Sequence, residues 1–254
     1  MDILKESEWL SINRVLLELY ALENEKEFHE KTLKVFRMLL PYTKGYFVVF
    51  DEKYNIDQKH SAFLGMSLEV FENYMLHYYD KDYLKFTFEI ATETMTYRDT
   101  DILSDSMRKK TDFFRNHLRP NNIPYGSGIL LAKNSRLFGV INLFRSGELG
   151  DFSDKDMYIF DLLKDHMTNI TYRFINQTQT QAQDRKHKLT QLSAQLGLTA
   201  KEQEVSKLIL QGMTNAEISK ELVISESTVK KHLYNLYAKA GVKNRLQLIT
   251  LFDQ

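Results

Sequence analysis

Apolar residues recur at helical spacing at the start of the chain. In residues 3–20, Val15 and Leu19 fall on one face of a helix, with charged residues on the other face. This spacing predicts an amphipathic helix, because about 3.6 residues per turn bring positions three and four apart onto one side. Residues 27–40 repeat the pattern and stop at Pro41, which cannot continue a helix. We therefore expect two helices here.

Three later runs concentrate apolar, β-branched and aromatic residues, as strands do. The first covers residues 46–50. The other two, residues 128–133 and 137–144, lie on either side of Asn134 and Ser135. Two such runs separated by a short polar turn predict an antiparallel hairpin.

Helical spacing returns in residues 68–79 and in a long stretch that Ser153 caps and that we expect to end near Phe174. Helices mixed with antiparallel strands, without regular βαβ alternation, predict an α+β fold. Residues 176–188 are rich in Gln, Thr and charge and have no apolar period, which is typical of a linker. The expected organisation is an α+β domain at 1–175, a linker at 176–195 and a helical domain at 196–254.

The last quarter of the chain predicts two helices joined by a short turn. Asn215 and Ser225 can each cap a helix, because their side chains accept a hydrogen bond from a backbone N–H of the first turn. In the second helix Val229, Leu233 and Leu236 form one apolar stripe. Two packed helices, of which the second presents hydroxyl, amide and ammonium groups, have the geometry of helix-turn-helix DNA readers. The exposed face of the second helix would carry Thr228, Lys230, Lys231, Tyr234 and Asn235.

Four motifs in this region share their order and spacing with one known DNA-binding fold. They are Leu198-Thr199-x-x-Glu202-x-Glu204-Val205, Gly212-x-Thr214-Asn215-x-Glu217-Ile218, Ile224-Ser225-x-x-Thr228-Val229-Lys230-x-His232 and Lys239-x-Gly241-Val242-x-x-Arg245. Almost without gaps, this region resembles the four-helix LuxR/GerE-type DNA-binding domain. Ser219 and Ala240 depart from the family, which usually has Ala and Leu there, but neither lies on the presumed DNA face.

The resemblance implies which side chains face DNA. It places Lys230, Lys231 and Tyr234 at base edges, and Lys can reach guanine O6 and N7. A Lys pair on a helix is otherwise commonly a solvated face. His232 fits a structural or phosphate-side role as well as it fits base reading. The residues placed nearer phosphates, which Ser, Thr and Asn mostly contact, are Thr214, Asn215, Ser227, Thr228 and Arg245.

The distribution of charge predicts DNA as a partner, and the symmetry of DNA half-sites predicts a second copy of the chain. From residue 182 onward the chain has 11 basic and 7 acidic residues, a net +4 (11 − 7), so the rest of this neutral chain carries −4. This asymmetry favours double-stranded DNA as a partner of the C-terminal part. We also expect a homodimer, because paired readers match two half-sites about one helical turn apart. The resemblance implies reader–reader contacts from residues 244–252, through Leu246, Ile249 and Thr250, although Leu246 and Ile249 fit an ordinary core equally.

A second resemblance covers residues 114–166. Its motifs are Leu118-Arg119-Pro120, Gly-Val-Ile-Asn-Leu-Phe-Arg at 139–145, Phe152-Ser153-x-x-Asp156 and Leu162-x-x-x-x-His166. This segment is similar to the C-terminal half of the PAS/GAF-like sensor domains attached to LuxR-type regulators. Upstream, Tyr74-x-x-x-Tyr78-x-x-x-Asp82 is similar to the region that lines the pocket of acyl-homoserine-lactone receptors. Those pockets also contain tryptophan, whereas the only tryptophan here is Trp9.

The resemblance to sensor domains implies a small-molecule effector that binds in the N-terminal domain. A ligand site is concave and mostly apolar, with a few convergent polar groups. The aromatic candidates at helical spacing fit a plain core as well, and Asp82 fits a solvated helix end. The alternative is therefore a ligand-free dimerisation or protein-interaction module with constitutive DNA binding. The candidate ligand-binding residues are Tyr46, Phe50, Phe71, Tyr74, Tyr78, Asp82, Ile129 and Asn142.

Several other classes find no support in the sequence. The chain has no cysteine, its seven histidines are scattered, and it has no Gly-rich phosphate loop or nucleophile elbow, so we expect no metal, no cofactor and no catalytic residues. Asp51 follows a strand, as a receiver phosphoacceptor would, but a chain that opens with two helices does not fit a receiver. The N-terminus lacks a signal-peptide run, and no stretch approaches the roughly 18 apolar residues of a membrane span. We expect a cytoplasmic protein without membrane contact.

Overall fold

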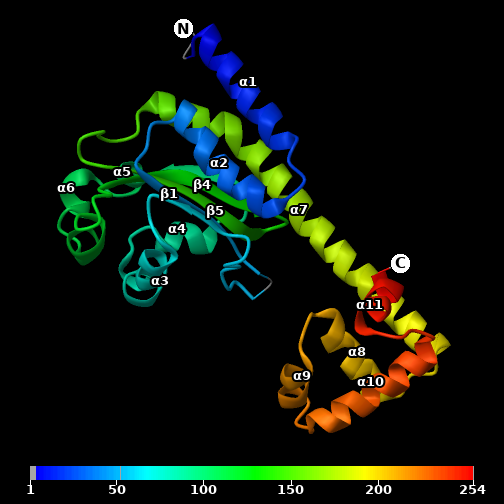
Figure 1. Ribbon diagram of the computed structural model, residues 1–254. Helices are drawn as coiled ribbons and strands as arrows, with labels where there is room; N and C mark the ends of the chain where they lie inside the picture. The colour runs from blue at the N-terminus through cyan, green and yellow to red at the C-terminus, as the bar shows by residue number, and fades with distance from the viewer. Residues whose placement is uncertain (1–3, 52, 254) are drawn as a thin grey trace. The chain divides into compact units, whose positions relative to one another are not determined.

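The computed structural model describes residues 4–51 and 53–253, except for the side chains at 178–179, 181–187 and 253. The chain divides into two compact units, Met1–Phe174 and Ile175–Gln254. The first combines helices with an antiparallel sheet and the second is all helical, which confirms the predicted combination of an α+β domain with a helical domain (Figure 1).

The N-terminal unit is built around one five-stranded antiparallel sheet with the order β2-β1-β5-β4-β3. The predicted hairpin is present as β4 and β5, and its turn residues Asn134 and Ser135 have the left-handed φ values of 54° and 58° that a tight hairpin turn requires. The short edge strands β2 and β3 were not predicted, because three or four residues are too few to show a period. The strands are β1 (Lys44–Val49), β2 (Ala62–Leu64), β3 (Met95–Arg98), β4 (Tyr125–Lys133) and β5 (Arg136–Arg145).

Helices cover both faces of this sheet (Figure 1). Successive side chains of a strand point to opposite faces. On one face Phe47 of β1 lies 5.8 Å from the Phe28 ring of α2 (Glu25–Leu39). That ring lies 5.5 Å from Phe174 of α7 (Asp154–Gln195). On the other face Tyr46 of β1 lies 4.8 Å from the Phe71 ring of α3 (Leu68–His77). The two faces therefore have separate apolar layers.

The first half of the chain contributes mostly short helices. Those of two turns or fewer were not predicted from the sequence. The helices are α1 (Glu6–Tyr20), α2 (Glu25–Leu39), α3 (Leu68–His77), the 3-10 helix η1 (Tyr79–Lys81), α4 (Lys85–Ile90), α5 (Asp99–Ile102), α6 (Asp105–Arg108) and the π-helix η2 (Phe114–Leu118).

Helix α7 (Asp154–Gln195) is longer than expected. The prediction that it ends near Phe174 is wrong, because the polar stretch after that residue continues the helix to Gln195. Gln, Lys, Arg and Ala are good helix formers, so a helix can persist where the apolar period ends.

Four helices form the C-terminal unit. They are α8 (Ala200–Leu210), α9 (Asn215–Glu221), α10 (Glu226–Ala240) and α11 (Arg245–Asp253). Their shared core includes Val205, Ile218, Val229 and Leu248, each 0% exposed. Gly241 ends α10 with a left-handed φ of 67°.

The caps of the two reader helices differ in part from the prediction. Ser225 caps α10 as predicted, since its side chain accepts a hydrogen bond from the Thr228 backbone N–H. The cap of α9 is Thr214 and not Asn215. Thr214 and Glu217 form a reciprocal capping box, which fixes the helix start one residue earlier than expected.

Candidate functional site

The candidate DNA-reading helix is α10, which α8 and α9 hold through one buried stripe. Val229 and Leu236 are 0% exposed and Leu233 is 6% exposed, as the apolar spacing predicted. The turn before α10 contains Val223, which is 89% exposed and has a left-handed φ of 53°. This turn orients α10 so that its other face is free of the core.

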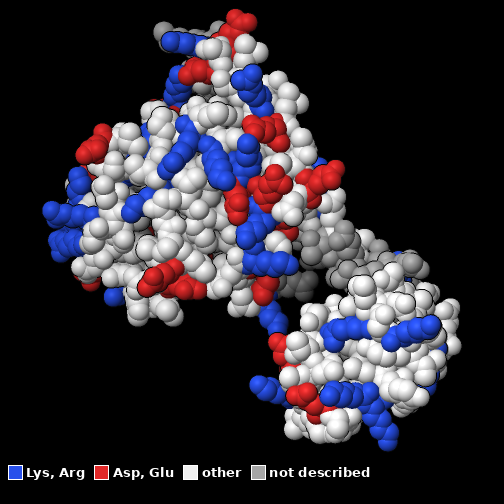
Figure 2. Space-filling model, in the orientation of Figure 1, with Lys and Arg blue, Asp and Glu red and all other residues white. Residues whose placement is uncertain are grey.

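The exposed face of α10 carries the predicted base-reading residues. Lys230 and Lys231 are exposed, and Tyr234 is 74% exposed. Within the described part of the chain, neither ammonium group has a carboxylate partner. Figure 2 shows basic side chains covering more of the visible face of this unit than acidic ones. These groups are available to an anionic partner.

Hydroxyl groups cluster at the first turn of α10. The Ser225 hydroxyl lies 2.7 Å from that of Ser227 and 2.8 Å from that of Thr228. Ser227 is exposed, whereas Thr228 and Asn235 are half-buried. A helix N-terminus with free N–H groups and hydroxyls is a common position for a phosphate.

The remaining predicted phosphate contacts have internal hydrogen bonds. The Thr214 hydroxyl donates to Glu217 at 2.8 Å as part of the α9 cap, and Asn215 is half-buried beside it. Arg245 donates to the carbonyl oxygens of Met213 and Ile209, and so ties α11 to the connection between α8 and α9. Phosphate contact by these three residues remains a prediction.

A buried ion pair that the sequence did not reveal joins α8 to α10. Glu202 is 3% exposed, and its carboxylate lies 2.6 Å from Lys239 Nζ, which also donates to the Gly197 carbonyl. Burial alone would raise the pKa of Glu202, but Lys239 and the N–H and hydroxyl of Thr199 outweigh burial and lower it. Residues far apart in sequence form this pair, so spacing gave no signal.

The candidate dimer residues of α11 differ in their exposure. Leu246 is 73% exposed, and Thr250 is exposed. Ile249 instead packs against the core of the unit. Of the two apolar candidates, only Leu246 presents a free side chain.

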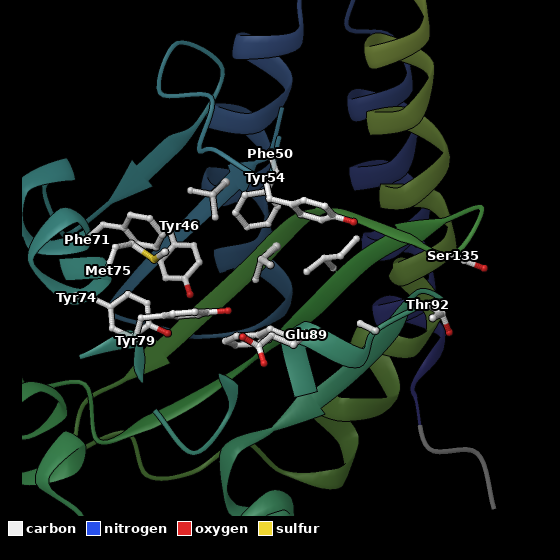
Figure 3. Close-up of a pocket in the computed structure, with 15 residues that line it drawn as sticks. Tyr46, Phe50, Tyr54, Phe71, Tyr74, Met75, Tyr79, Glu89, Thr92 and Ser135 are labelled. Atoms are coloured by element: carbon white, nitrogen blue, oxygen red, sulfur yellow. The ribbon is translucent and has the colours of Figure 1, made fainter. Parts of the chain in front are cut away.

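The N-terminal unit encloses an aromatic cavity of about 470 Å³, which we call the outer cavity. It lies on the α3 face of the sheet. Figure 3 shows Tyr46, Tyr74 and Tyr79 towards one end and Thr92 and Ser135 towards the other. The lining residues are Tyr46, Val48, Phe50, Tyr54, Phe71, Tyr74, Met75, Tyr79, Phe88, Glu89, Ala91, Thr92, Ser135, Leu137 and Val140.

A smaller space of about 20 Å³, the inner cavity, shares the walls of Tyr46, Phe71, Tyr74 and Phe88. Two carboxyl groups, an imidazole and an amide contribute to its walls. Its further lining residues are Met66, Asp82, Leu84, Asp99, Phe113, His117, Leu118, Asn142 and Phe144.

Buried hydrogen bonds organise the polar wall of the inner cavity. Asp82 accepts from the Tyr74 hydroxyl at 2.7 Å and from the Leu84 N–H at 2.8 Å. Asn142 Nδ2 donates to the Tyr46 hydroxyl at 3.2 Å. Burial raises the pKa of Asp82 to about 6, because it disfavours the charged form more than these two donors favour it.

Two members of this wall were not predicted. Asp99 is 2% exposed, and burial, followed by the charge of Asp82, raises its pKa. It presses against Gly126, where a Cβ would be only 2.7 Å from Asp99 Oδ2. His117 stacks on Phe113 at 5.4 Å, and burial lowers its pKa to about 4, so it is neutral. Asp99 follows the unpredicted strand β3, which explains why it was missed.

The structure brings six of the eight predicted ligand residues together. Tyr46, Phe50, Phe71 and Tyr74 line the outer cavity, and Asp82 and Asn142 line the inner one. Tyr78 lines neither cavity and packs on His117 at 4.9 Å. Ile129 is buried but also lines neither, because alternation along β4 sends its side chain to the opposite face from Leu130.

The structure also bears on a phosphoacceptor, a metal site and a membrane span, which the sequence analysis considered. Asp51 accepts hydrogen bonds from the backbone N–H groups of Lys53 and Asn55, so it shapes a loop. No three His, Cys, Asp or Glu side chains of the described residues are grouped so as to hold a metal ion. None of the described helices is long and apolar enough to cross a membrane.

Comparison with known proteins identifies the C-terminal unit. Residues 196–252 match the family of bacterial regulatory proteins named luxR. The spore germination protein GerE of Bacillus subtilis is 48% identical over 52 residues, which are 20% of this chain and 70% of that protein. The chain belongs to the luxR family of bacterial regulatory proteins. Other relatives that match this region are named as transcriptional regulatory proteins, not as enzymes.

Further similarities cover different shares of the chain. The CsgBAC operon transcriptional regulatory protein of Escherichia coli is 49% identical over 53 residues, or 21% of this chain and 24% of that protein. The chain thus matches about a quarter of the length of such luxR relatives. The VqsR LBD domain from Pseudomonas aeruginosa has a TM-score of 0.50 at 13% identity over 68% of this chain and 98% of that chain. This likeness shows a shared fold.

Proposed function

We propose that this luxR-family chain is a sequence-specific transcription regulator that binds double-stranded DNA through α10. The observation that carries the proposal is the exposed face of α10 on a helix that a buried stripe orients. On this face Lys230 and Lys231 have no carboxylate partner among the described residues. Lys230, Lys231 and Tyr234 would read base edges. The residues that would position the protein on the DNA are Thr214, Asn215, Ser227, Thr228, Asn235 and Arg245.

The N-terminal unit, in this proposal, binds a small-molecule effector in the outer cavity and tunes DNA binding. A volume of about 470 Å³ lies within the usual range for small-molecule sites. The lining is largely aromatic, and the polar groups of the inner cavity lie beside it. Helix α7 contributes residues to both units and is the natural element to transmit the effect.

The protein would act as a homodimer in the bacterial cytoplasm. Two copies would place two α10 helices on half-sites about one helical turn apart. Leu246 supports this arrangement, since a large apolar side chain that is 73% exposed on the last helix is suited to contact a second copy. Sedimentation of the full chain with and without operator DNA measures its oligomeric state directly.

Two measurements on the full chain test this function. A genome-wide binding map is expected to give discrete peaks that share a two-fold related motif. Mass spectrometry of small molecules released from the purified protein is expected to detect a retained compound, and removal of that compound should change operator affinity. Discrete DNA sites without any retained compound, and with affinity that cell extract does not alter, would favour the ligand-free module instead.

A further inference from the structure

The inner cavity collects hydrogen-bond acceptors that no described donor satisfies. Asn142 Oδ1 and Asp99 Oδ1 have no hydrogen-bond partner among the described residues, and the side chains are only 3% and 2% exposed. Both residues line this cavity, as does His117, whose Nδ1 is also without a partner among them. A buried acceptor without a donor costs free energy. This wall is therefore suited to a ligand that carries several N–H donors.

The charges around the two cavities leave one carboxyl group without a cation. Arg108 acts on Asp99, and Lys85 Nζ lies 3.6 Å from Glu89. Asp82 accepts hydrogen bonds only from a tyrosine hydroxyl and a backbone N–H, and no described Lys or Arg shifts its pKa. No lysine or arginine is among the described residues that line either cavity. A positive group in the inner cavity would supply the partner that a buried carboxylate requires.

The walls shared by the two cavities are aromatic. They consist of the rings of Tyr46, Phe71, Tyr74 and Phe88. The faces of such rings attract cations, and desolvation strengthens this attraction. Aromatic faces thus add to the carboxyl groups in favouring a positive ligand group over a negative one.

The sizes of the two cavities indicate a ligand with a small head group for the inner cavity and a larger body for the outer cavity. The inner cavity of about 20 Å³ exceeds the roughly 10–15 Å³ that one water-sized group requires. An ammonium group is of that size. The outer cavity of about 470 Å³ accommodates an apolar body of many atoms.

We propose that the effector is a primary amine with an apolar body, whose ammonium group lies in the inner cavity among Asp82, Asp99 and Asn142. This inference rests on the proposed effector-binding function of the outer cavity. A primary ammonium supplies three N–H donors and one positive charge. A neutral ligand with one N–H donor would satisfy a single acceptor and leave Asp82 without a cation.

The test compares ligands that share a body and differ in the head group. The probes are 4-phenylbutylamine, the neutral 4-phenylbutan-1-ol, and N-acetyl-4-phenylbutylamine, which has one N–H donor and no charge. Calorimetric titration of the full chain at pH 7.5 is expected to show the amine binding at least about ten-fold more tightly than the alcohol or the amide, because hydrogen bonds to charged groups are the stronger ones.

Variants locate the preference in the inner cavity. Asp82→Asn keeps the shape of the side chain and is expected to reduce the preference for amine over alcohol to less than about two-fold. Asp80→Asn is the matched control, because the Asp80 side chain is 86% exposed and lines neither cavity, so the preference should be unchanged. Asp99→Asn provides an independent variant, with a smaller expected loss because Arg108 already acts on Asp99.

A pH series separates charge recognition from a purely structural role of Asp82. Since the pKa of Asp82 is raised to about 6 in the free protein, amine affinity should rise from pH 5 to pH 7 as the carboxyl ionises. Alcohol affinity should not change over this range. In Asp82→Asn the rise should be smaller, because Asp99, whose pKa burial also raises, is then the one carboxyl group of the inner cavity among the described residues. Circular dichroism should show that the fold of the variant is retained.

Each outcome decides the proposal. Amine preference that Asp82→Asn removes supports it. Equal or weaker binding of the amine, or binding of none of the three probes, overturns it. If the amide binds and alters operator affinity while the amine does not, the effector function stands and only the ligand class is wrong. If no released compound and no probe alters operator affinity, the effector function fails as well.

Discussion

The polar groups of the two candidate sites lie outside the apolar core in the C-terminal unit and inside it in the N-terminal unit. In the C-terminal unit Lys230, Lys231 and Tyr234 lie outside a core that is apolar. In the N-terminal unit Asp82 and Asn142 lie inside, between the sheet and α3. A groove reader must expose its groups to a large partner, whereas a small-molecule site must surround one. Substitutions of the exposed groups should therefore affect binding alone, whereas substitutions of the buried groups should also affect stability.

The largest expected effect tests the exposed side of this contrast. Lys230→Ala combined with Lys231→Ala should lower operator affinity at least about 100-fold, since each lost base contact by Lys contributes roughly 1–3 kcal/mol. Because both residues are exposed, the midpoint of thermal unfolding should not change. Fluorescence anisotropy with labelled operator measures the affinity. Lys207→Ala, an exposed lysine on α8, is the control, and an unchanged affinity of the double variant would refute the assignment of α10.

The buried side of the contrast is tested at Asp82. Its folded-state pKa of about 6 lies above the usual 3.8, so the folded state holds the proton more tightly than the unfolded state. Compared with Asp82→Asn, the wild-type N-terminal unit should therefore lose about 2 kcal/mol of stability as the pH rises from 4 to 7. The comparison with the variant is needed because burial lowers the pKa of His29 and His117 to about 4, which stabilises the unit over the same range. Hydrogen exchange of β1 and β5 peptides in urea measures it. An identical pH dependence of stability in the wild type and in Asp82→Asn contradicts the prediction.

The contribution of Glu202 to the stability of the C-terminal unit should respond to pH in the opposite sense to that of Asp82. The pKa of Glu202 is lowered in the folded state, so its contribution is present above the unfolded value of 4.5 and is lost as the pH falls below it. Lys239→Met should cost about 1–3 kcal/mol at pH 7, because Glu202 would stay buried without its cation. Adding Glu202→Gln should restore part of this loss. Urea unfolding followed through α8 and α10 peptides measures both variants.

The smallest expected effect concerns the turn before α10. Val223 is β-branched and has a left-handed φ of 53°, a conformation that costs such residues roughly 1–2 kcal/mol. Val223→Asn should raise the free energy of unfolding by about 1 kcal/mol, since an 89% exposed side chain contributes little packing. Val223→Thr keeps the branching and should give no gain in thermal unfolding experiments. Equal effects of the two substitutions would show that the backbone carries no strain there.

The sequence predicted the exposed reader better than the buried cavities. The reader helices were predictable because cap, stripe and exposed face all lie within one short segment, and only the cap of α9 was displaced by one residue, to Thr214. The hairpin of β4 and β5 was predictable because its turn needs particular residues. These elements are local in the chain.

The cavities depend on pairings that no local pattern carries. Tyr46 and Asn142 are neighbours only because β1 pairs with β5, and Asp99 joins them through the short strand β3. Ile129 was misplaced because the face of a strand residue depends on register, and a shift of one position exchanges the two faces. Periodicity detects single elements, but it does not show which elements become neighbours.

The contact between Gly126 and Asp99 has a consequence for how this chain can change over generations. A side chain at position 126 would meet the Asp99 carboxyl group at 2.7 Å, so no other residue fits there while that carboxyl group stays in place. Among descendants of this chain the two positions should therefore be inherited as a pair. A lineage that replaces Gly126 must displace or replace the Asp99 carboxyl group, and either change would move an acceptor of the inner cavity from its present place.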